Sequence, residues 1–254
     1  MAGSENAEIT IEALTTGHQF REAVALQETI WGFEKIELLP VRLFITATKV
    51  GGQAFGGYSD GKMIAFCLAI PGIKPGGRAY LHSHMLGVLP EYRNSGIGRR
   101  LKLRQRDDAL SRDLHLIEWT FDPLEVKNAY FNMQRLGAIV RRFVRNQYGM
   151  TSSHLHGGLP TDRCTAEWWI ASDRVRRLID GQPIENPPIV ERISLTNEIG
   201  EIRRTDPARA REIQADLADR LETAFAKELA VVGVERSAEA STYLLAHPEP
   251  KEFA

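Results

Sequence analysis

Two glycines, Gly96 and Gly98, lie between an apolar segment and a segment rich in arginine. When a strand ends in a glycine-containing loop and a helix follows, the loop presents unpaired backbone N–H groups at the positive end of the helix. These groups suit a diphosphate, and a glycine has no Cβ to keep phosphates away from the backbone. Arg93, Arg99 and Arg100 add positive charge that can serve a further phosphate. The segment is therefore predicted to bind a phosphorylated ligand.

The spacing of these glycines excludes two other phosphate-binding loops. A dinucleotide loop needs Gly-x-Gly-x-x-Gly, and a P-loop needs Gly-Lys followed by Ser or Thr; neither pattern occurs here. The structural alternative is a plain strand–turn–helix joint with a solvated basic face. The longer run in residues 88–98, Val-Leu-Pro-Glu-Tyr-Arg-Asn-Ser-Gly-Ile-Gly, is more specific than Gly-x-Gly and favours ligand binding.

Histidine pairs raise the question of a metal ion. His82 and His84 form one His-x-His pair, and His154 and His156 form a second in a glycine-containing loop. The pairs lie far apart in the sequence, and no carboxylate or cysteine completes a familiar ligand set. We therefore expect no metal, and we expect the second pair to lie in a substrate loop or a simple connection.

The elements that would position these residues alternate between strands and helices, as judged from apolar periodicity. Asp60-Gly61 supplies the positive φ angles of a tight hairpin turn. The predicted strands cover residues 8–14, 53–58, 63–70, 79–88, 114–121, 138–148 and 164–172. The predicted helices cover residues 40–50, 98–113 and 124–136, after a first helix that starts at Thr16 or Gly17 and turns Phe20, Val24, Ala25 and Ile30 inward.

Residues 173–254 have a different character. Pro187-Pro188 marks a joint, and Asp206-Pro207 is a helix start with Asp as N-cap and Pro at N1. An apolar stripe follows, and residues 231–234 and 243–245 are predicted to form a closing hairpin. This segment has too few apolar residues to be stable alone. We therefore predict a main domain, residues 1–172, and a C-terminal extension, residues 173–254, packed on it.

The composition places the protein among ordinary globular chains. It has 254 residues, of which 43% are hydrophobic and 26% charged. A formal net charge of −1 gives no global attraction to nucleic acid or to anionic membranes. Cys67 and Cys164 provide no disulfide framework. The polar N-terminus and the lack of a bilayer-length apolar stretch predict a cytoplasmic protein without nucleic-acid or membrane partners.

The run at residues 88–98 resembles the acyl-coenzyme A loop of the GNAT acyltransferases, whose signature is Arg/Gln-x-x-Gly-x-Gly/Ala. The resemblance continues through residues 114–121, through residues 128–132 (Asn-Ala-Tyr-Phe-Asn) and through Leu136-Gly137. The order of elements resembles one GNAT domain over about two-thirds of the chain. Asp122-Pro123, residues 128–132 and the C-terminal extension resemble a bacterial subgroup in which some relatives are thought to succinylate D-amino acids.

The resemblance implies an α/β (α+β) fold with a mixed central sheet, flanked by helices and splayed at the coenzyme A site, with a helix-plus-hairpin extension. It implies that pantetheine lies between the strands ending at Val88 and Phe121 and pairs with the backbone of Leu86 and Val88. The other residues that it implies for coenzyme A are Arg93, Asn94, Ser95, Gly96, Ile97, Gly98, Arg99 and Asn128.

The resemblance also implies direct attack of a neutral amine on the thioester, for which a base removes a proton and an acid assists the leaving thiolate. His84 and Glu118 are the candidate bases. Many GNAT enzymes place a Tyr four residues before the Gly that ends the helix, but this chain has Met133 there. Tyr130, one turn earlier, is the candidate acid. For each residue the alternative is a purely structural role in the sheet or the core.

These observations predict an acyl-CoA-dependent N-acyltransferase. It would move an acetyl or succinyl group from acetyl-CoA or succinyl-CoA to a primary amine of a small molecule such as an amino acid. A succinyl group would need a cation near the thioester, for which Arg78, Arg135 and Arg145 are candidates. The alternative is a catalytically degenerate GNAT domain that binds coenzyme A as a sensor or scaffold, which Met133 favours. A homodimer is left open.

Overall fold

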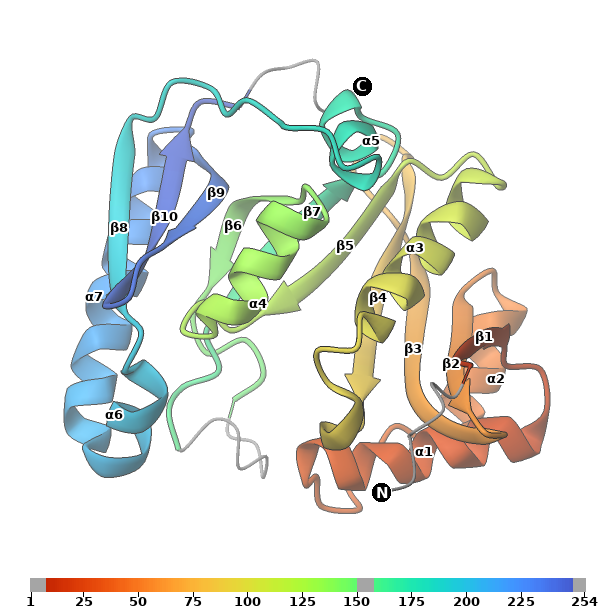
Figure 1. Ribbon diagram of the computed structural model, residues 1–254. Helices are drawn as coiled ribbons and strands as arrows, with labels where there is room; N and C mark the ends of the chain where they lie inside the picture. The colour runs from red at the N-terminus through yellow and green to blue at the C-terminus, as the bar shows by residue number, and fades with distance from the viewer. Residues whose placement is uncertain (1–7, 150–157, 249–254) are drawn as a thin grey trace, which may run out of the picture. The chain divides into compact units, whose positions relative to one another are not determined.

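The computed structural model describes residues 8–149 and 158–248. Helices and strands alternate in a mixed α/β architecture whose mostly antiparallel sheet is flanked by helices (Figure 1). The chain divides into two compact units, an N-terminal unit (residues 1–117) and a C-terminal unit (residues 118–254). The domain boundary predicted between residues 172 and 173 stays a prediction.

The N-terminal unit has a sheet in the order β1-β2-β3-β4, with antiparallel neighbours. The hairpin turn between β2 and β3 is the predicted one, since Asp60 (φ 49°) and Gly61 (φ 73°) both have positive φ angles. The elements of this unit are β1 (Thr10–Ala13), α1 (Gly17–Trp31), α2 (Val41–Lys49), β2 (Gln53–Ser59), β3 (Lys62–Ile73), β4 (Ala79–Val88), the 3₁₀ turn η1 (Pro90–Tyr92) and α3 (Ile97–Leu110).

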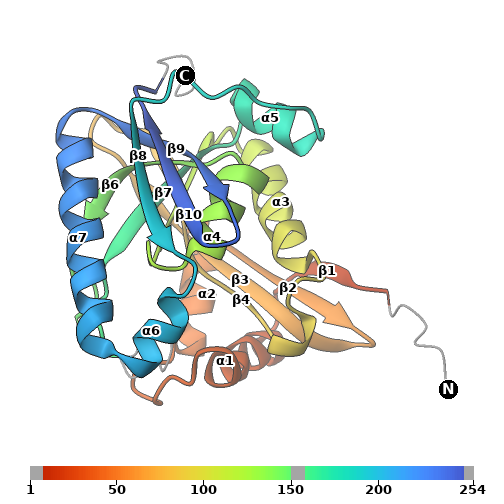
Figure 2. The same cartoon turned by 60° about the vertical axis from the view of Figure 1, so that its left-hand side comes forward.

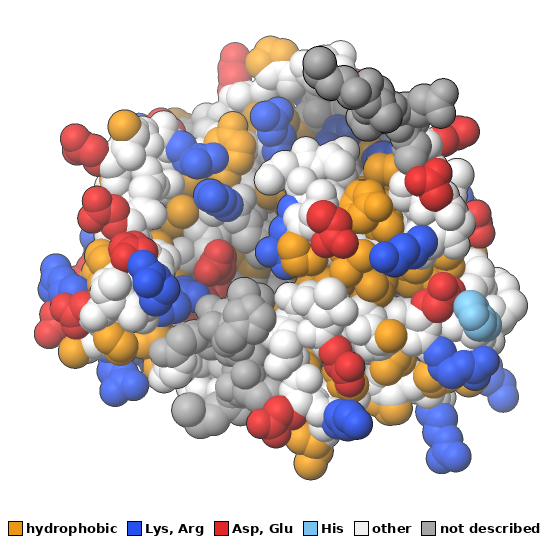
Figure 3. All heavy atoms as spheres, turned by 60° about the horizontal axis from the view of Figure 1, so that its bottom comes forward, with side chains coloured by type: hydrophobic (Ala, Val, Ile, Leu, Met, Phe, Trp, Pro, Cys, Tyr) orange, Lys and Arg blue, Asp and Glu red, His pale blue; other side chains and the backbone are white. Residues whose placement is uncertain are grey.

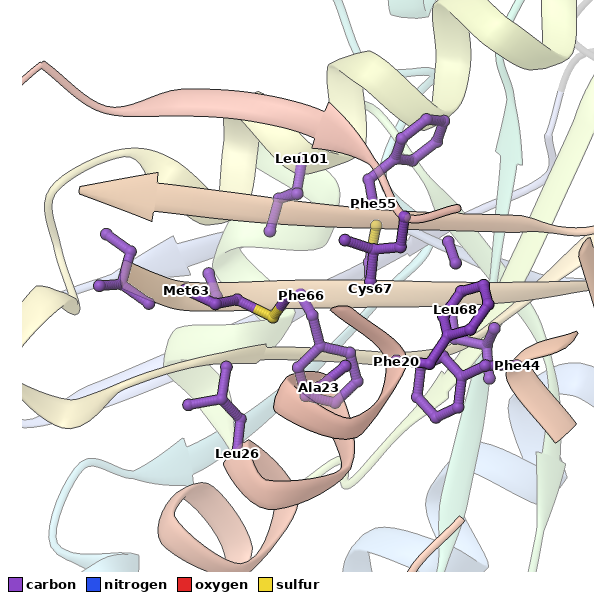
Figure 4. Packing of buried hydrophobic residues seen from close by; sticks show 14 of the residues in the cluster. Phe20, Ala23, Leu26, Phe44, Phe55, Met63, Phe66, Cys67, Leu68 and Leu101 are labelled. Carbon is purple, nitrogen blue, oxygen red and sulfur yellow. The ribbon is translucent and has the colours of Figure 1, made fainter. Parts of the chain in front are cut away.

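Helices cover both faces of this sheet. Phe66 of β3 packs edge-on against Trp31 of α1 and contacts Phe44 of α2. Cys67, the next residue, points to the opposite face, where Leu101 of α3 also lies (Figure 4). Because neighbouring side chains on a strand alternate, β3 contributes to an apolar layer on each side, and its residues 63–69 are all buried.

Helix α1 begins as predicted. Thr16 is its N-cap, and Thr16 and Gln19 form a reciprocal capping box. Phe20 is buried as expected, but Ala25 is exposed, and Ala23 faces the sheet instead. Val24 packs partly buried against the same core and Ile30 is buried, both as predicted, so of the four predicted inward residues only Ala25 points away from the core.

The boundary between the two units falls within strand β5 (Leu116–Phe121). In the C-terminal unit the strand order is β5-β7-β6-β9-β10-β8. The other elements of this unit are α4 (Val126–Tyr130), the π-helical turn η2 (Phe131–Arg135), β6 (Ile139–Val144), β7 (Arg163–Trp169), α5 (Asp173–Ile179), β8 (Glu191–Thr196), α6 (Ile199–Thr205), α7 (Pro207–Ala226), β9 (Ala230–Arg236) and β10 (Ala240–Ala246).

The segment after residue 172 is built largely from the predicted elements. Asp206 caps α7 by accepting the N–H of Arg209, and β9 and β10 form the predicted hairpin. β9 pairs with β6, and β8 pairs with the far side of β10. Helices α6 and α7 follow β8 and pack on each other (Figure 2). Strand β8 and helices α5 and α6 were not predicted.

The predicted helix over residues 124–136 is shorter and less regular than expected. It starts at Val126 and changes to a π-helical turn after Tyr130. It ends as predicted at Gly137, whose φ is 79° and whose N–H donates to the carbonyl of Met133. π-Helical turns are uncommon and often occur at functional sites.

Basic and acidic side chains are interspersed on the face of the molecule in Figure 3. This mixture agrees with the formal net charge of −1. Within residues 8–149 and 158–248, no helix is both long enough and apolar enough to cross a membrane.

Candidate functional site

The glycine loop joins β4 to α3 in the predicted strand–loop–helix order. Asn94 (φ 64°) and Gly96 (φ 83°) both adopt the left-handed conformation, and the hydroxyl of Ser95 donates to the carbonyl of Tyr92 at 2.7 Å. Gly96 is the N-cap of α3 and offers no side chain to the first turn. Backbone N–H groups in that turn have no partner within the helix, so a ligand with phosphate oxygens suits this end of α3.

The two glycines of the motif have different reasons to be glycine. Gly96 needs its positive φ angle, which an L side chain would strain. Gly98 has an ordinary helical conformation, and a Cβ built on it would lie 3.8 Å from the side chain of Leu86 and 4.0 Å from that of Val88, which are normal contact distances. Neither backbone strain nor packing within the described chain requires a glycine at position 98.

The three arginines around the loop make different contacts with the rest of the chain. The Nη2 of Arg100 donates to the carbonyl of Ile9 at 2.7 Å, so Arg100 braces the chain just before β1. This contact gives Arg100 a structural role, and its contribution of charge for a phosphate stays a prediction. The exposed Arg93 lies in the loop, with Nε 3.5 Å from the carbonyl of Val88, and Arg99 lies half-buried in the first turn of α3.

A β-bulge interrupts β4 at His84. Leu68 of β3 pairs with Met85, and Ala69 pairs with Ser83, so His84 is an extra residue without a partner in the ladder. Bulges bend a strand and re-aim the side chains that follow. His84 is half-buried, and burial lowers the pKa of its imidazole.

The bulge reverses the faces of β4. Before it, Ser83 points toward α3, whose side chains it contacts. After it, Leu86 and Val88 point toward Gly98 of α3, and a Cβ on Gly87 would collide with Trp31 of α1. A regular strand would put Leu86 on the face opposite to Ser83. The predicted pairing of His82 and His84 on one face agrees with the 5.9 Å between their ring centroids.

A buried lysine lies beside the bulge, and the sequence analysis missed it. Lys102 of α3 is only 4% exposed, and its ammonium donates to the hydroxyl of Ser83 at 2.8 Å. That hydroxyl in turn donates to the side-chain carbonyl of Gln105 at 2.9 Å. Burial lowers the pKa of Lys102 to about 7, although the nearby Cys67 opposes the shift. The buried face of α3 contains Ile97 and Leu101, and residue 102 lies next to that face in a helical projection. Such a projection of the sequence would therefore have indicated that Lys102 is buried.

In the C-terminal unit, Glu118 of β5 belongs to a buried ionic cluster. Its carboxylate and that of Glu167 of β7 are each 3% exposed. Arg142 of β6 binds both carboxylates, through Nη2 to Glu118 and through Nε to Glu167 at 3.3 Å. Arg141 binds Glu167 through Nη2 at 2.5 Å and Nε at 3.1 Å. Burial of these carboxylates is compensated by the guanidinium groups.

A second bulge explains why two consecutive arginines reach one carboxylate. Val140 pairs with Ala166 and Arg142 pairs with Thr165, so Arg141 is the extra residue in β6. In a regular strand, neighbouring side chains point to opposite faces. One carboxylate oxygen of Glu118 already accepts a hydrogen bond from the guanidinium of Arg142, which matters for its candidacy as a base. Among the hydrogen bonds and ion pairs of the described residues, His84 has no charged partner of this kind.

Tyr130, the candidate acid, is half-buried at the end of α4. Two guanidinium groups lie over its ring, Arg135 at 5.9 Å and Arg236 of β9 at 5.5 Å from the ring centroid. Met133, at the position where many GNAT enzymes have a tyrosine, is fully buried. Asn128 is exposed on α4 and accessible to a ligand.

Tyr148 is a further residue that the sequence analysis did not single out. Its hydroxyl lies 2.8 Å from the Thr120 hydroxyl oxygen, and the guanidinium of Arg163 lies 5.5 Å from its ring centroid. Thr120 and Glu118 alternate with apolar residues on β5 and so share a face. The polar face of β5 therefore includes Thr120 as well as Glu118, and Tyr148 contacts this face through the Thr120 hydroxyl.

The three candidate cations for a succinyl group have different surroundings. Arg145 is bound by two carboxylates of α7, Asp219 at 2.6 Å and Glu222 at 2.8 Å, which compensate its charge. Arg135 lies over Tyr130, and Arg78 lies in the turn before β4. Arg145 is thus the least suited of the three to hold a carboxylate of a ligand.

Within the described part of the chain, no group of three or more His, Cys, Asp or Glu side chains could hold a metal ion. The pair formed by His82 and His84 therefore has no third ligand of these types there. His154 and His156 lie outside the described residues.

A family comparison matches the description "Acetyltransferase (GNAT) family" to residues 20–137. Residues 20–137 belong to the GNAT superfamily. The match contains the glycine loop, Glu118 and Asn128, and it ends at Gly137. The GNAT segment thus includes all of the residues that the sequence analysis assigned to coenzyme A and to proton transfer. The elements from β6 onward lie outside it.

Solved structures share the fold of the GNAT segment at low sequence identity. The ribosomal-protein-S18-alanine N-acetyltransferase of Escherichia coli is 19% identical, with 64% of this chain and 94% of that chain covered at a TM-score of 0.50. A Salmonella typhimurium protein with its cofactor acetyl-CoA is 14% identical, with 65% and 96% covered at a TM-score of 0.51. An Arabidopsis thaliana protein in complex with the bisubstrate analogue CoA-Ac-MVNAL is 14% identical, with 63% and 97% covered at a TM-score of 0.50. A search of curated protein sequences finds no match.

Proposed function

We propose that this GNAT protein is an acyl-CoA-dependent N-acyltransferase that transfers an acetyl or succinyl group to a primary amine of a small molecule. The observation that carries the proposal is Gly98. The chain's own packing leaves room for a Cβ at this position, on the uncapped first turn of α3. A backbone kept open next to unpaired N–H groups is what close approach of a diphosphate requires.

The residues proposed for coenzyme A keep the roles that the GNAT resemblance implies. Gly96, Ile97 and Gly98 offer backbone N–H groups to the diphosphate, with Asn94 and Ser95 shaping the loop. Arg93 and Arg99 supply charge for phosphates. Leu86 and Val88 offer backbone groups to pantetheine, and Asn128 offers an amide from α4. The acyl-CoA is a cosubstrate, whose thioester carbonyl the amine attacks.

Proton transfer is proposed to use His84. The lowered pKa of His84 keeps the imidazole neutral at neutral pH, so it can accept a proton from the amine. Glu118 is the second candidate, but accepting a proton there competes with its bond to Arg142. Tyr130 is the proposed acid, since it lies one helical turn before the position where many GNAT enzymes have a tyrosine, and the guanidinium groups of Arg135 and Arg236 lie over its ring.

The activity is tested by release of free coenzyme A thiol from acetyl-CoA and from succinyl-CoA, each offered with a panel of primary amines that includes D- and L-amino acids. Amine-dependent thiol release with either donor supports the proposal, and mass spectrometry of the product identifies the acyl group and the amine. Binding of coenzyme A without thiol release across the panel would instead favour the sensor or scaffold, for which the buried Met133 at the usual tyrosine position is the supporting observation.

A further inference from the structure

Helix α6 lies in the C-terminal segment, by which we mean residues 173–254, and so outside residues 20–137, which match the GNAT family. Its Arg203 is 8% exposed and bridges two carboxylates. Nη2 lies 3.2 Å from Oδ2 of Asp122, and Nη1 lies 3.2 Å from Oε1 of Glu125. A guanidinium has donors in a fixed fork, so one side chain can fix two acceptors relative to each other.

The two carboxylates lie at the two ends of the loop that leads from β5 to α4. Asp122 follows β5 directly, and its other oxygen accepts the N–H of Leu124 at 2.8 Å. Glu125 is the N-cap of α4, and its carbonyl accepts the N–H groups of Asn128 at 2.9 Å and Ala129 at 3.0 Å. Arg203 therefore connects the end of a strand to the first turn of a helix.

The same loop has a second attachment to the C-terminal segment. The hydroxyl of Tyr243 of β10, which is buried, donates to the carbonyl of Pro123 at 2.5 Å. The Glu125 side chain is not itself used as a helix cap. The direction in which α4 leaves the loop is thus set by contacts from α6 and β10 and not by capping within the helix.

We propose that Arg203 is a positioning residue for the acyltransferase site: by holding Asp122 and Glu125, it fixes the start of α4 and so the placement of Asn128 and Tyr130. This inference rests on the proposed function, because those two residues are the ones proposed to contact the acyl-CoA. It gives the C-terminal segment a role in the activity of the GNAT segment.

The test compares two variants with the wild-type chain. Arg203→Met removes the guanidinium and leaves two carboxylates without it. The triple variant Asp122→Asn, Glu125→Gln, Arg203→Met removes all three charges while keeping similar side-chain volumes. Arg204→Met is the matched control, since the neighbouring Arg204 is exposed and pairs with Glu201 within α6. The measurements are Tm, the Kd of acetyl-CoA and of succinyl-CoA by calorimetry, and amide hydrogen exchange of Leu124, Asn128 and Ala129.

Arg203→Met is expected to lower Tm by on the order of 10 °C, because it leaves the largely buried carboxylate of Asp122 without the guanidinium that compensates its charge. The triple variant is expected to recover most of that Tm. Acyl-CoA binding is expected to weaken about tenfold or more in both variants, and the named amides to exchange faster in both, because neither variant holds the loop. Arg204→Met is expected to match the wild type.

Three outcomes overturn the inference. If the triple variant recovers acyl-CoA affinity together with Tm, Arg203 is merely structural. Wild-type affinity and exchange in both variants would mean that Arg203 does not position α4. If the wild-type chain binds neither acetyl-CoA nor succinyl-CoA, the proposed function itself fails and takes this role with it, which the wild-type titration alone reveals.

Discussion

The ammonium group of Lys102 donates a hydrogen bond to the hydroxyl of Ser83 at 2.8 Å, inside the layer between α3 and β4. Ser83 is the residue immediately before the bulge at His84, so this bond holds β4 at the point where its register shifts. A buried amine of this kind loses most of its hydration, and burial lowers the pKa of Lys102 to about 7. Its protonation state therefore changes within the range in which the protein can be studied.

The stability of the protein should consequently depend on pH through Lys102. The unfolded chain keeps this proton up to the usual pKa of 10.5, whereas the folded chain releases it from about 7 upward. Between these values the unfolded state binds more protons, so the free energy of unfolding rises with pH by up to about 1.4 kcal/mol per pH unit. The contribution is fully present above 10.5 and is lost as the pH falls through 7.

Urea denaturation between pH 7 and 9.5 measures this slope. Lys102→Met should remove most of it, because the variant has no group at this position that releases a proton on folding. Cys67, which faces Lys102 from β3, has a pKa raised to about 12 by burial and stays a thiol in this range. The exposed Lys62, the first residue of β3, gives the control Lys62→Met. Equal slopes for the wild type and Lys102→Met would show that Lys102 is not the group responsible.

Alanine substitutions at the two glycines of the loop should have opposite effects on stability. Gly98→Ala is expected to stabilise the fold by up to about 1 kcal/mol, because alanine is the better helix former and the site has room for a Cβ. Gly96→Ala is expected to destabilise it by about 1 kcal/mol, because the left-handed backbone there disfavours a side chain. Thermal unfolding measures both changes.

Acyl-CoA affinity should fall in Gly98→Glu, since a bulky and negatively charged side chain would stand between the backbone and the diphosphate. Gly98→Ala should keep most of the affinity, because the GNAT signature accepts alanine at this position. Calorimetric titration with acetyl-CoA and succinyl-CoA measures the loss in Gly98→Glu, which we expect to be about tenfold or more, equivalent to at least ~1.4 kcal/mol. A folded Gly98→Glu variant that keeps full affinity would remove the main support for coenzyme A binding at this loop.

The pH profile of the proposed acyl transfer should reveal His84. Burial lowers the pKa of this imidazole, so the base becomes available at a pH below the ~6.5 that is usual for histidine. We expect log kcat/KM to fall on the acidic side with a limb in that region. His84→Gln should lower kcat/KM by about 10²–10⁴-fold and abolish that limb, without changing acyl-CoA affinity. Retention of the limb in His84→Gln would leave Glu118 or water as the base.

Charge removal at Arg142 should destabilise the C-terminal unit. Arg142→Met leaves the buried carboxylate of Glu118 without the guanidinium of Arg142. We expect the free energy of unfolding to fall by about 1–3 kcal/mol, a range that allows for the 46% exposure of the Arg142 side chain. Adding Glu118→Gln should restore part of the loss. A double-mutant cycle by urea denaturation measures the coupling. Additive effects of the two substitutions would mean that the contact contributes nothing to stability.

Local sequence signals predicted most of the elements. Strand β4 occupies residues 79–88 as predicted, because an apolar run is bounded by glycines and prolines on both sides. Helix α7 starts at Pro207 because Asp206 caps it. The hairpin of β9 and β10 follows from two short apolar runs. In each case the deciding residues are neighbours in the sequence.

The features missed by the sequence analysis depend on partners that are distant in the chain. The bulges at His84 and Arg141 are insertions relative to a neighbouring strand, and the alternation within one strand does not reveal them. Burial of Lys102 depends on Ser83, and the ionic cluster of Glu118 depends on Arg142. Strand β8 has alternating polar residues and forms because β10 lies beside it. The proposed coenzyme A roles, by contrast, rest on a local motif.

The single extra residue in β4 makes this strand intolerant of a one-residue deletion. Without His84 the ladder with β3 would become regular, but every side chain after Ser83 would exchange faces. Leu86 would turn toward Trp31, where even a Cβ on Gly87 has no room, and the space beside Gly98 would lose the side chains that border it. Comparative alignments of such chains should therefore keep the length between Ser83 and Gly98 constant even where the residue types vary.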